Sequence, residues 1–179
     1  MEIDLFGSWF RSLVLGMMKI DMAGVSYQAQ KDTKFKQVKI TSCPPGWIQG
    51  PRNCYFLSHF GGTWADANSV CQGFLGKLAE PIEEDSFQFL SKASKNVSAN
   101  HGQFFLGGSD MFVEGIWLWS STKTMIYKNH WSPGGPSDSG HNEDCLTFVG
   151  GVLNDVPCTS TYSFICQLES EEEGTQVIG

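Results

Sequence analysis

The chain has 179 residues, of which 41% are hydrophobic and only 17% are charged, so it can form one domain with a core of its own. Its formal net charge is −7, which argues against a nucleic-acid-binding protein, because such a protein needs a basic face. Residues 43–168 carry six basic and eleven acidic residues, whereas residues 1–42 carry six basic and four acidic ones. The middle of the chain is therefore the acidic part, and acidic loops suit a hard divalent cation.

The cysteines predict a disulfide framework. Their number is even, no Cys-x-x-Cys pair is present, and no Cys and His residues have zinc-ligand spacing; they are Cys43, Cys54, Cys71, Cys145, Cys158 and Cys166. Disulfides indicate an oxidising compartment, so we expect a secreted protein, although Arg11 interrupts the apolar run that would serve as a signal peptide. No apolar run approaches the roughly 20 residues of a membrane span.

We divide the chain into an N-terminal arm or degenerate signal and linker (1–42), one domain (43–168) and an acidic C-terminal tail (169–179). Within the domain, residues 53–58 are typical of a strand. A helix is predicted to start at Thr63, which forms a capping box with Asp66. A second helix follows Pro81 and buries Phe87, Leu90 and Val97.

After residue 100, short apolar runs alternate with Gly, Pro, Ser and Asp, which indicates strands joined by loops; the runs are FFLGG, IWLW, CLTFV and YSFIC. The segment 132–144 is rich in the same loop residues, and a long loop inside a compact domain is usually functional. Two helices followed by several short strands predict an α+β fold.

The ordered segments of residues 43–168 resemble a C-type lectin domain, and in particular the perlucin-like lectins of molluscs; these segments are CPPGWIQGPRNCYFLS, TWADANSVCQGFLGKLAEP, FFLGGSD, GIWLWSS, NHWSPGGP, EDCLTF and YSFIC. The resemblance implies an α+β domain with two helices, short antiparallel sheets and a long calcium and ligand loop. It also implies the long form with three disulfides, Cys43–Cys54, Cys71–Cys166 and Cys145–Cys158.

The resemblance further implies a primary calcium and sugar site, carried here by Glu143, Asn154, Asp155 and Ser137. The family has Glu-Pro-Asn or Gln-Pro-Asp where this chain has Gly135-Pro136-Ser137. Glycine offers no side-chain oxygen, and a serine hydroxyl is a neutral ligand, whereas calcium takes six to eight oxygens, many from carboxylates. We therefore expect a degenerate primary site. A cis bond is expected at Pro136.

The resemblance also implies an auxiliary calcium site, whose ligands correspond to Asp110, Glu114, Asp138, Glu143 and Asp144. Simpler interpretations remain for several residues. Asp110 caps a turn under this interpretation, and Asn154 and Asp155 are turn formers. Two tryptophans, Trp117 and Trp119, are then core residues rather than sugar-stacking platforms.

Asn96 is the first residue of an Asn-Val-Ser glycosylation sequon.

An enzyme is not expected. The four histidines are scattered among loops, and no Ser, His and acidic residue form a known motif; they are His59, His101, His130 and His141. If all cysteines are bridged, none is available as a nucleophile.

The leading hypothesis is a secreted protein that recognises a glycan or glycoprotein with the help of calcium. The alternative is a sugar-independent lectin-like domain that binds a protein or a mineral or matrix surface. A third interpretation is an acidic matrix protein, in which the basic arm and acidic tail promote assembly. The sequence leaves open whether the chain forms a homo-oligomer, which matters because weak lectin sites gain avidity from multivalency.

Overall fold

The computed structural model describes residues 42–95, 97 and 102–169. The N-terminal arm apart from residue 42, the acidic tail apart from Glu169, and Asn96 of the sequon lie outside the described residues.

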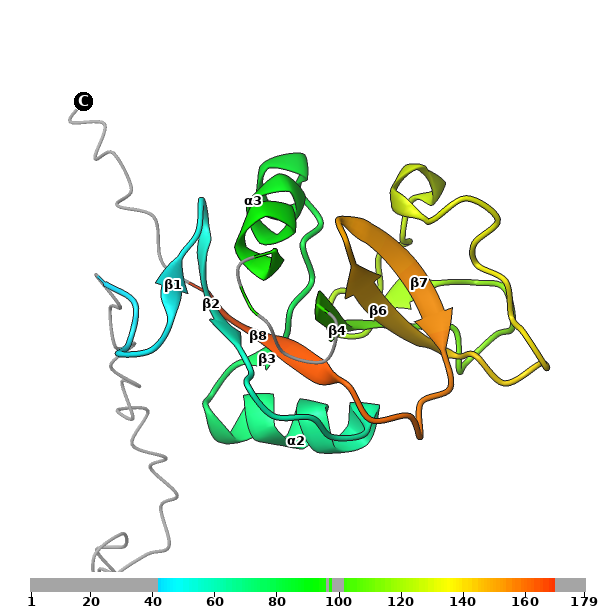
Figure 1. Cartoon of the computed structure of the whole chain (residues 1–179), viewed down its shortest axis with the longest axis horizontal. Coiled ribbons are helices and arrows are strands. Elements are labelled where there is room, and N and C mark those ends of the chain that lie inside the picture. The colour runs from blue at the N-terminus through cyan, green and yellow to red at the C-terminus, as the bar shows by residue number, and fades with distance from the viewer. Residues whose placement is uncertain (1–41, 96, 98–101, 170–179) are drawn as a thin grey trace, which may run out of the picture. The chain divides into compact units, whose positions relative to one another are not determined.

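Two helices flank the sheet, α2 (Trp64–Gly73) and α3 (Glu84–Ser94) (Figure 1). The predicted capping box is confirmed: Asp66 N donates to Thr63 Oγ1 at 3.2 Å, and Thr63 N donates to Asp66 Oδ2 at 3.2 Å. α3 ends at Ser94, so Val97 lies beyond the helix rather than on it. Val97 nevertheless packs against the core cluster to which Phe87 and Leu90 belong.

The remaining elements are short strands and one 3₁₀ helix: β1 (Ile48–Gln49), β2 (Asn53–Leu57), β3 (Lys77–Leu78), β4 (Gln103–Ser109), β5 (Leu118–Trp119), η2 (Lys128–His130), β6 (Cys145–Val149), β7 (Val152–Val156) and β8 (Ser163–Glu169). The strand order is β1-β2-β8-β4-β6-β7, with β3 also paired to β8 and β5 to β4. All these pairs are antiparallel except β4–β8, which is parallel. The α+β fold class is confirmed.

The three disulfides pair as the resemblance implies: Cys43–Cys54, Cys71–Cys166 and Cys145–Cys158. The second bridge joins α2 to β8, and the third joins the start of β6 to the segment after β7. No cysteine is left free.

The core positions the loop at 132–144. Trp117 and Trp119 are 6% and 4% exposed, which confirms them as core residues. The ring of Trp117 meets that of Trp131 edge-on, with centroids 4.8 Å apart. Trp131 also pairs with Leu153 of β7, and Ser132 N donates to Leu153 O at 2.9 Å. The loop therefore leaves the core directly beside β7.

Candidate functional site

The loop at 132–144 is fixed by hydrogen bonds to a buried carboxylate. Asp155 lies in β7, opposite Leu146 of β6, and its side chain is fully buried. Its Oδ2 accepts two backbone hydrogen bonds, from Ser137 N and Asp138 N, each 2.6 Å long. The Gly135–Pro136 peptide just before these two donors is cis, as expected. Asp155 therefore fixes where the loop turns.

The other residues of the predicted primary set gather around this turn. Glu143 Oε2 accepts from Ser137 Oγ at 3.0 Å and from Ser139 N at 2.7 Å. Asn154 Nδ2 donates to Asp155 O at 2.7 Å, and Asn154 Oδ1 accepts from Ser132 Oγ at 3.4 Å. The structure therefore links Ser137, Glu143 and Asp155 in one hydrogen-bonded group and places Asn154 at its edge.

Asn154 and Asp155 lie inside β7, so the alternative that they are turn formers is wrong. β7 pairs along its whole length with β6, and Asn154 stands opposite Thr147. The acidic and amide side chains are consequently carried by a regular strand, which is a more rigid support than a loop.

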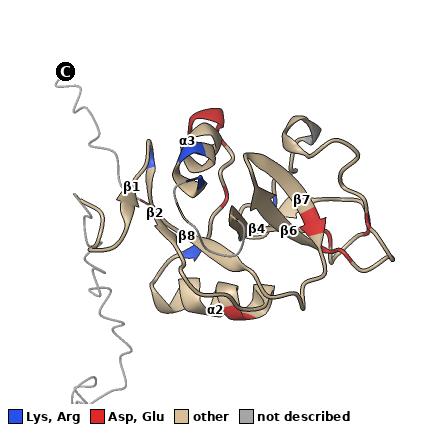
Figure 2. Cartoon of the chain, viewed as in Figure 1, with Lys and Arg blue, Asp and Glu red and all other residues tan. Residues whose placement is uncertain are grey.

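The predicted auxiliary set lies next to this group. Asp110 directly follows β4, is 4% exposed, and its backbone N donates to Asp144 O at 3.3 Å. Its Oδ2 accepts from Gly115 N at 3.0 Å, so Asp110 does cap the turn that carries Glu114. Asp138 Oδ1 accepts from Glu143 N at 3.4 Å. Figure 2 shows acidic residues gathered at the end of β7 and in the loops beside it.

The carboxylates of this region influence one another's pKa values. Burial raises the pKa of Asp110, and the charges of Asp144 and Asp138 raise it further. Loss of hydration raises the pKa of Glu114, and repulsion from Asp110, Asp138 and Asp144 acts in the same direction. Asp138 behaves differently, because a 2.9 Å hydrogen bond to His141 Nδ1 lowers the pKa of its carboxyl group.

The carboxylates do not form a finished cage. Among the described residues, no three His, Cys, Asp or Glu side chains are grouped so that they could hold a metal ion. Asp138 Oδ2 is turned toward His141, and Glu114 is exposed. Since like charges repel, carboxylates that share a site spread apart unless a cation lies between them.

Among the described residues, two buried carboxylate oxygens near the loop lack a hydrogen-bond partner. In the described part of the chain, three buried side-chain oxygens have no hydrogen-bond partner: Asp110 Oδ1, Asp155 Oδ1 and Ser163 Oγ. A buried carboxylate oxygen without a partner is costly. One of the two carboxylate oxygens belongs to the auxiliary set and the other to the primary set. The chemistry of both sets therefore fits a hard cation with oxygen ligands.

Sequence reasoning missed three residues of this site. Ser132 bonds Asn154, Ser139 donates its backbone N–H to Glu143, and His141 pairs with Asp138. No pattern in the sequence distinguishes these residues from other polar loop residues, because the loop conformation alone brings them into contact. Another histidine, His130, makes different contacts: its ring stacks on Phe87 with centroids 3.9 Å apart, and it forms a hydrogen bond with Glu84.

Comparison with known proteins gives matches over this same region. A family model described as the C-type lectin domain matches residues 61–168. Perlucin of Haliotis laevigata is 34% identical over 131 residues, which are 71% of this chain and 83% of perlucin. Lactose-binding lectin l-2 of Anguilla japonica is 33% identical, over 73% of this chain and 81% of that lectin.

The fold agrees with these matches. The solved carbohydrate-recognition domain of cow CD23 has a TM-score of 0.65 and 27% identity, and the likeness covers 73% of this chain and 98% of that one. The predicted resemblance, including that to perlucin-like lectins, is thereby confirmed. Since the family model covers more than half of the chain, the chain belongs to the family of C-type lectin domains.

Proposed function

We propose that this domain binds carbohydrate through a calcium-linked site built on β7 and the loop at 132–144, and that the site is weakened by Gly135 and Ser137. The observation that carries the proposal is Asp155: it orders the loop through Oδ2 and leaves its buried Oδ1 without a partner. Two named relatives support the ligand class. One is a lactose-binding lectin, and the CD23 domain was solved in the presence of a GlcNAc2Man3 oligosaccharide.

In this proposal, the domain holds two calcium ions. The ligands of the first are Glu143, Asn154, Asp155 and Ser137, and the ligands of the second are Asp110, Glu114, Asp138, Asp144 and Glu143. A bound calcium ion supplies open coordination positions that two vicinal sugar hydroxyls can fill. The protein's own contribution is to place oxygen ligands on a rigid strand and to donate or accept hydrogen bonds at the same hydroxyls.

We also propose that the protein acts outside the cell and is not an enzyme. Its three disulfides are stable in an oxidising compartment, and the relatives named above are not described as enzymes. No helix among the described residues is long and apolar enough to cross a membrane.

The test is titration of calcium into the full oxidised chain, followed by calorimetry and by thermal melts. We expect bound calcium to raise the melting temperature, because a ligand that binds only the native state stabilises it. Asp155→Asn keeps an oxygen for the two loop N–H groups and removes only the charge, so we expect it to fold normally and to lose the primary site. Asp110→Asn is the matched variant for the auxiliary site.

Retention on immobilised glycans completes the test. We expect the wild-type chain to be retained in calcium and released by a chelator, and we expect Asp155→Asn not to be retained. The proposal fails if calcium gives neither heat nor a shift in melting temperature, or if no glycan on a broad array is bound in its presence.

A second candidate function is sugar-independent binding of a protein, and one surface feature favours it. Met111, Phe112 and Val113 are 49%, 78% and 55% exposed and lie between Asp110 and Glu114, and Ile116, just after Glu114, is 43% exposed. An exposed apolar patch of this kind often marks an interaction surface.

This alternative makes an opposite prediction. Extracellular proteins from the source tissue would be retained on the immobilised chain with or without chelator, and Asp155→Asn would not change their retention. Phe112→Ser would abolish it. Retention that follows calcium and Asp155 instead would exclude this alternative.

A further inference from the structure

A short antiparallel ladder joins residues 116–119, which include β5, to residues 124–127. Leu118 and Met125 stand opposite each other in this ladder. Two backbone hydrogen bonds, each 3.0 Å long, flank that pair. Side chains alternate between the two faces of such a ladder, so one face is turned toward the core and the other away from it.

The two faces of the ladder differ in burial but not in polarity. On the inner face, Trp117, Trp119 and Ile126 are at most 6% exposed. On the outer face, Met125 is 64% exposed and Tyr127 is 70% exposed. An antiparallel sheet with one buried face normally carries polar residues on the other face, so an apolar outer face requires an explanation.

The turn at 111–113 extends this outer face. Lys123 belongs to the connection between the two segments of the ladder, and its Nζ lies 5.2 Å from the centroid of the Phe112 ring. The turn therefore lies beside the ladder, and Ile116 leads from one into the other. We call the combined surface the apolar face; its six residues are Met111, Phe112, Val113, Ile116, Met125 and Tyr127.

The size of the apolar face indicates a partner. From their exposed fractions, its six side chains present roughly 700 Å² per copy, whereas the largest apolar patch on a typical monomer measures roughly 300–600 Å². Each partner in a standard protein–protein interface contributes roughly 800 Å². Two copies of the apolar face placed together would therefore bury nearly the area that a stable interface needs.

The chemistry of the apolar face favours a second copy of the chain over a lipid surface. Two acidic residues, Asp110 and Glu114, enclose the turn, and the whole chain has a net charge of −7, so an anionic lipid surface would repel it. Homodimer interfaces are more apolar than other interfaces. An apolar face is also complementary to itself, as a two-fold interface requires.

We propose that the apolar face is a homodimer interface, which pairs two copies of this chain about a two-fold axis. Its six residues lie outside both proposed calcium sets, so the dimer does not need calcium. The interface goes beyond the proposed carbohydrate function. Where that function holds, the dimer carries two sugar sites, and a weak site gains avidity from the second one. The dimer also covers the surface on which sugar-independent protein binding would depend.

The experiment measures the mass of the full oxidised chain in a calcium chelator, by sedimentation equilibrium and by light scattering, across the micromolar range. We expect a concentration-dependent dimer, because interfaces of this size bind with micromolar or tighter affinity. We expect the dimer to persist in high salt, since salt does not screen apolar contacts. Assembly through the basic arm and the acidic tail would instead weaken as the salt concentration rises, and that result would contradict the proposal.

Two variants, Phe112→Ser and Met125→Ser, each remove an exposed apolar side chain from the apolar face. Each should raise the dissociation constant of the dimer at least about tenfold, because a two-fold interface contains every substitution twice. The matched control is Leu75→Asn, which should leave the dimer unchanged. Leu75 follows α2, is 91% exposed and has a φ of 61°, which asparagine tolerates. Circular dichroism checks that all three variants are folded.

The proposal is overturned if the chain is monomeric throughout the micromolar range, or if the dimer survives the double variant Phe112→Ser/Met125→Ser. A monomeric chain that co-sediments with phosphatidylcholine vesicles, and loses this binding in Phe112→Ser, would identify a lipid surface and would overturn the dimer as well. The carbohydrate function is tested separately, since a chain that dimerises but is not retained on glycans contradicts that function alone.

Discussion

At the scale of single residues, the proposed weakness of the primary calcium site rests on the two positions that flank Pro136. Gly135 provides no oxygen, and Ser137 Oγ is already engaged by Glu143 Oε2 at 3.0 Å. Gly135 does not have a positive φ, so its backbone accepts a side chain. An added Cβ would lie 3.0 Å from Ser132 Oγ, 3.3 Å from Ser132 O and 3.4 Å from Trp131 Cε3. The position can therefore carry a longer residue only if Ser132 Oγ rotates and the backbone at Ser132 shifts slightly.

The double variant Gly135→Glu/Ser137→Asn tests this account by gain of function. It adds one carboxylate and one amide oxygen, and calcium affinity rises with the number and charge of its oxygen ligands. We expect calcium to bind the primary site about tenfold more tightly, with stronger retention on mannose. Calorimetric titration and a mannose column measure the two effects.

The matched control is the same double substitution combined with Asp155→Asn, which should abolish the gain. A double variant with unchanged calcium affinity would show that the flanks of Pro136 do not limit the site.

At the scale of elements, the disulfides have separable roles. Cys71–Cys166 spans 95 residues and joins α2 to β8, whereas Cys145–Cys158 spans 13 residues at the end of the β6–β7 pair. On the chain-entropy model, the long bridge stabilises by about 4–5 kcal/mol and the short one by about 3 kcal/mol. Only the short bridge adjoins the site, because Cys145 follows Asp144 directly.

We therefore expect Cys71→Ala/Cys166→Ala to cost more stability and Cys145→Ala/Cys158→Ala to cost more calcium affinity, relative to its loss of stability. Denaturant unfolding without calcium measures the first quantity, and calcium titration under native conditions measures the second. If the Cys145→Ala/Cys158→Ala variant keeps full calcium affinity, the pairing of β6 with β7 is sufficient to hold Asp155 in place.

The elements also show what a sequence can predict. The start of α2 was predictable because its capping box is local, with Thr63 and Asp66 three residues apart. β7 was not foreseen, since Asn154 and Asp155 are poor strand formers and are kept in the strand by pairing with β6. The end of α3 was misplaced for a similar reason: Val97 continues the apolar period, yet it reaches the core from outside the helix.

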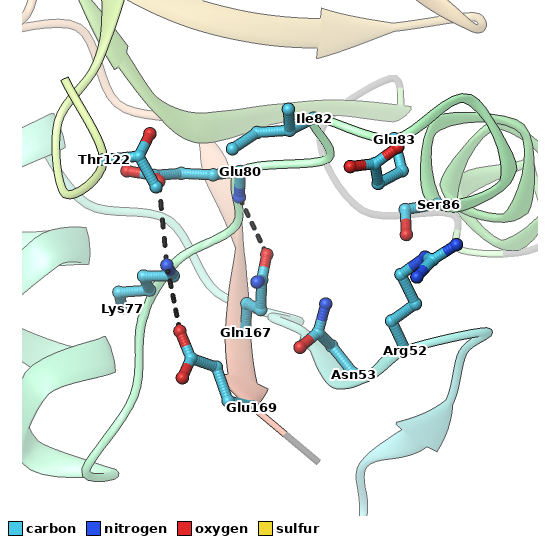
Figure 3. A pocket seen from close by; sticks show the side chains of 10 residues that line it. All are labelled: Arg52, Asn53, Lys77, Glu80, Ile82, Glu83, Ser86, Thr122, Gln167 and Glu169. Carbon is cyan, nitrogen blue, oxygen red and sulfur yellow. Dashed lines mark hydrogen bonds and ion pairs between the residues drawn. The ribbon is translucent and has the colours of Figure 1, made fainter. Parts of the chain in front are cut away.

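The candidate site, too, could be predicted from the sequence only in part. Its acidic residues could be identified from the order of the family's segments, because identity and order are properties of the sequence. The hydrogen bonds from Ser137 N and Asp138 N to Asp155 Oδ2 could not be predicted. They join residues 18 and 17 positions apart, and they exist only because of the conformation of the loop. The polar hollow lined by Lys77, Glu80 and Gln167 (Figure 3) could not be predicted either, since its walls come from residues of β2, β3, α3 and β8 and from loops.

At the scale of the whole molecule, the proposed calcium binding should depend on pH, because its ligands are carboxylates in a chain whose net charge is −7. The raised pKa values of Asp110 and Glu114 mean that the folded state binds protons more readily there than the unfolded state does. As the pH falls through these raised values, protonation removes unfavourable charge, so these two groups make the calcium-free protein more stable. Asp138, Asp66 and Glu84 have lowered pKa values, and their contribution is lost only as the pH falls below the ordinary carboxylate range.

As the pH falls from neutral to about pH 5, just above the ordinary pKa values of Asp and Glu, Asp110 and Glu114 are the first of these carboxylates to gain protons. We expect the melting temperature without calcium to hold or to rise over this range, while the increase produced by calcium becomes smaller, because calcium must displace protons from Asp110 and Glu114. Thermal melts with calcium and with chelator at each pH measure both trends. Asp110→Asn should flatten both, since it cannot titrate, whereas a calcium shift that stays constant down to about pH 5 would contradict a role for these carboxylates in holding the ion.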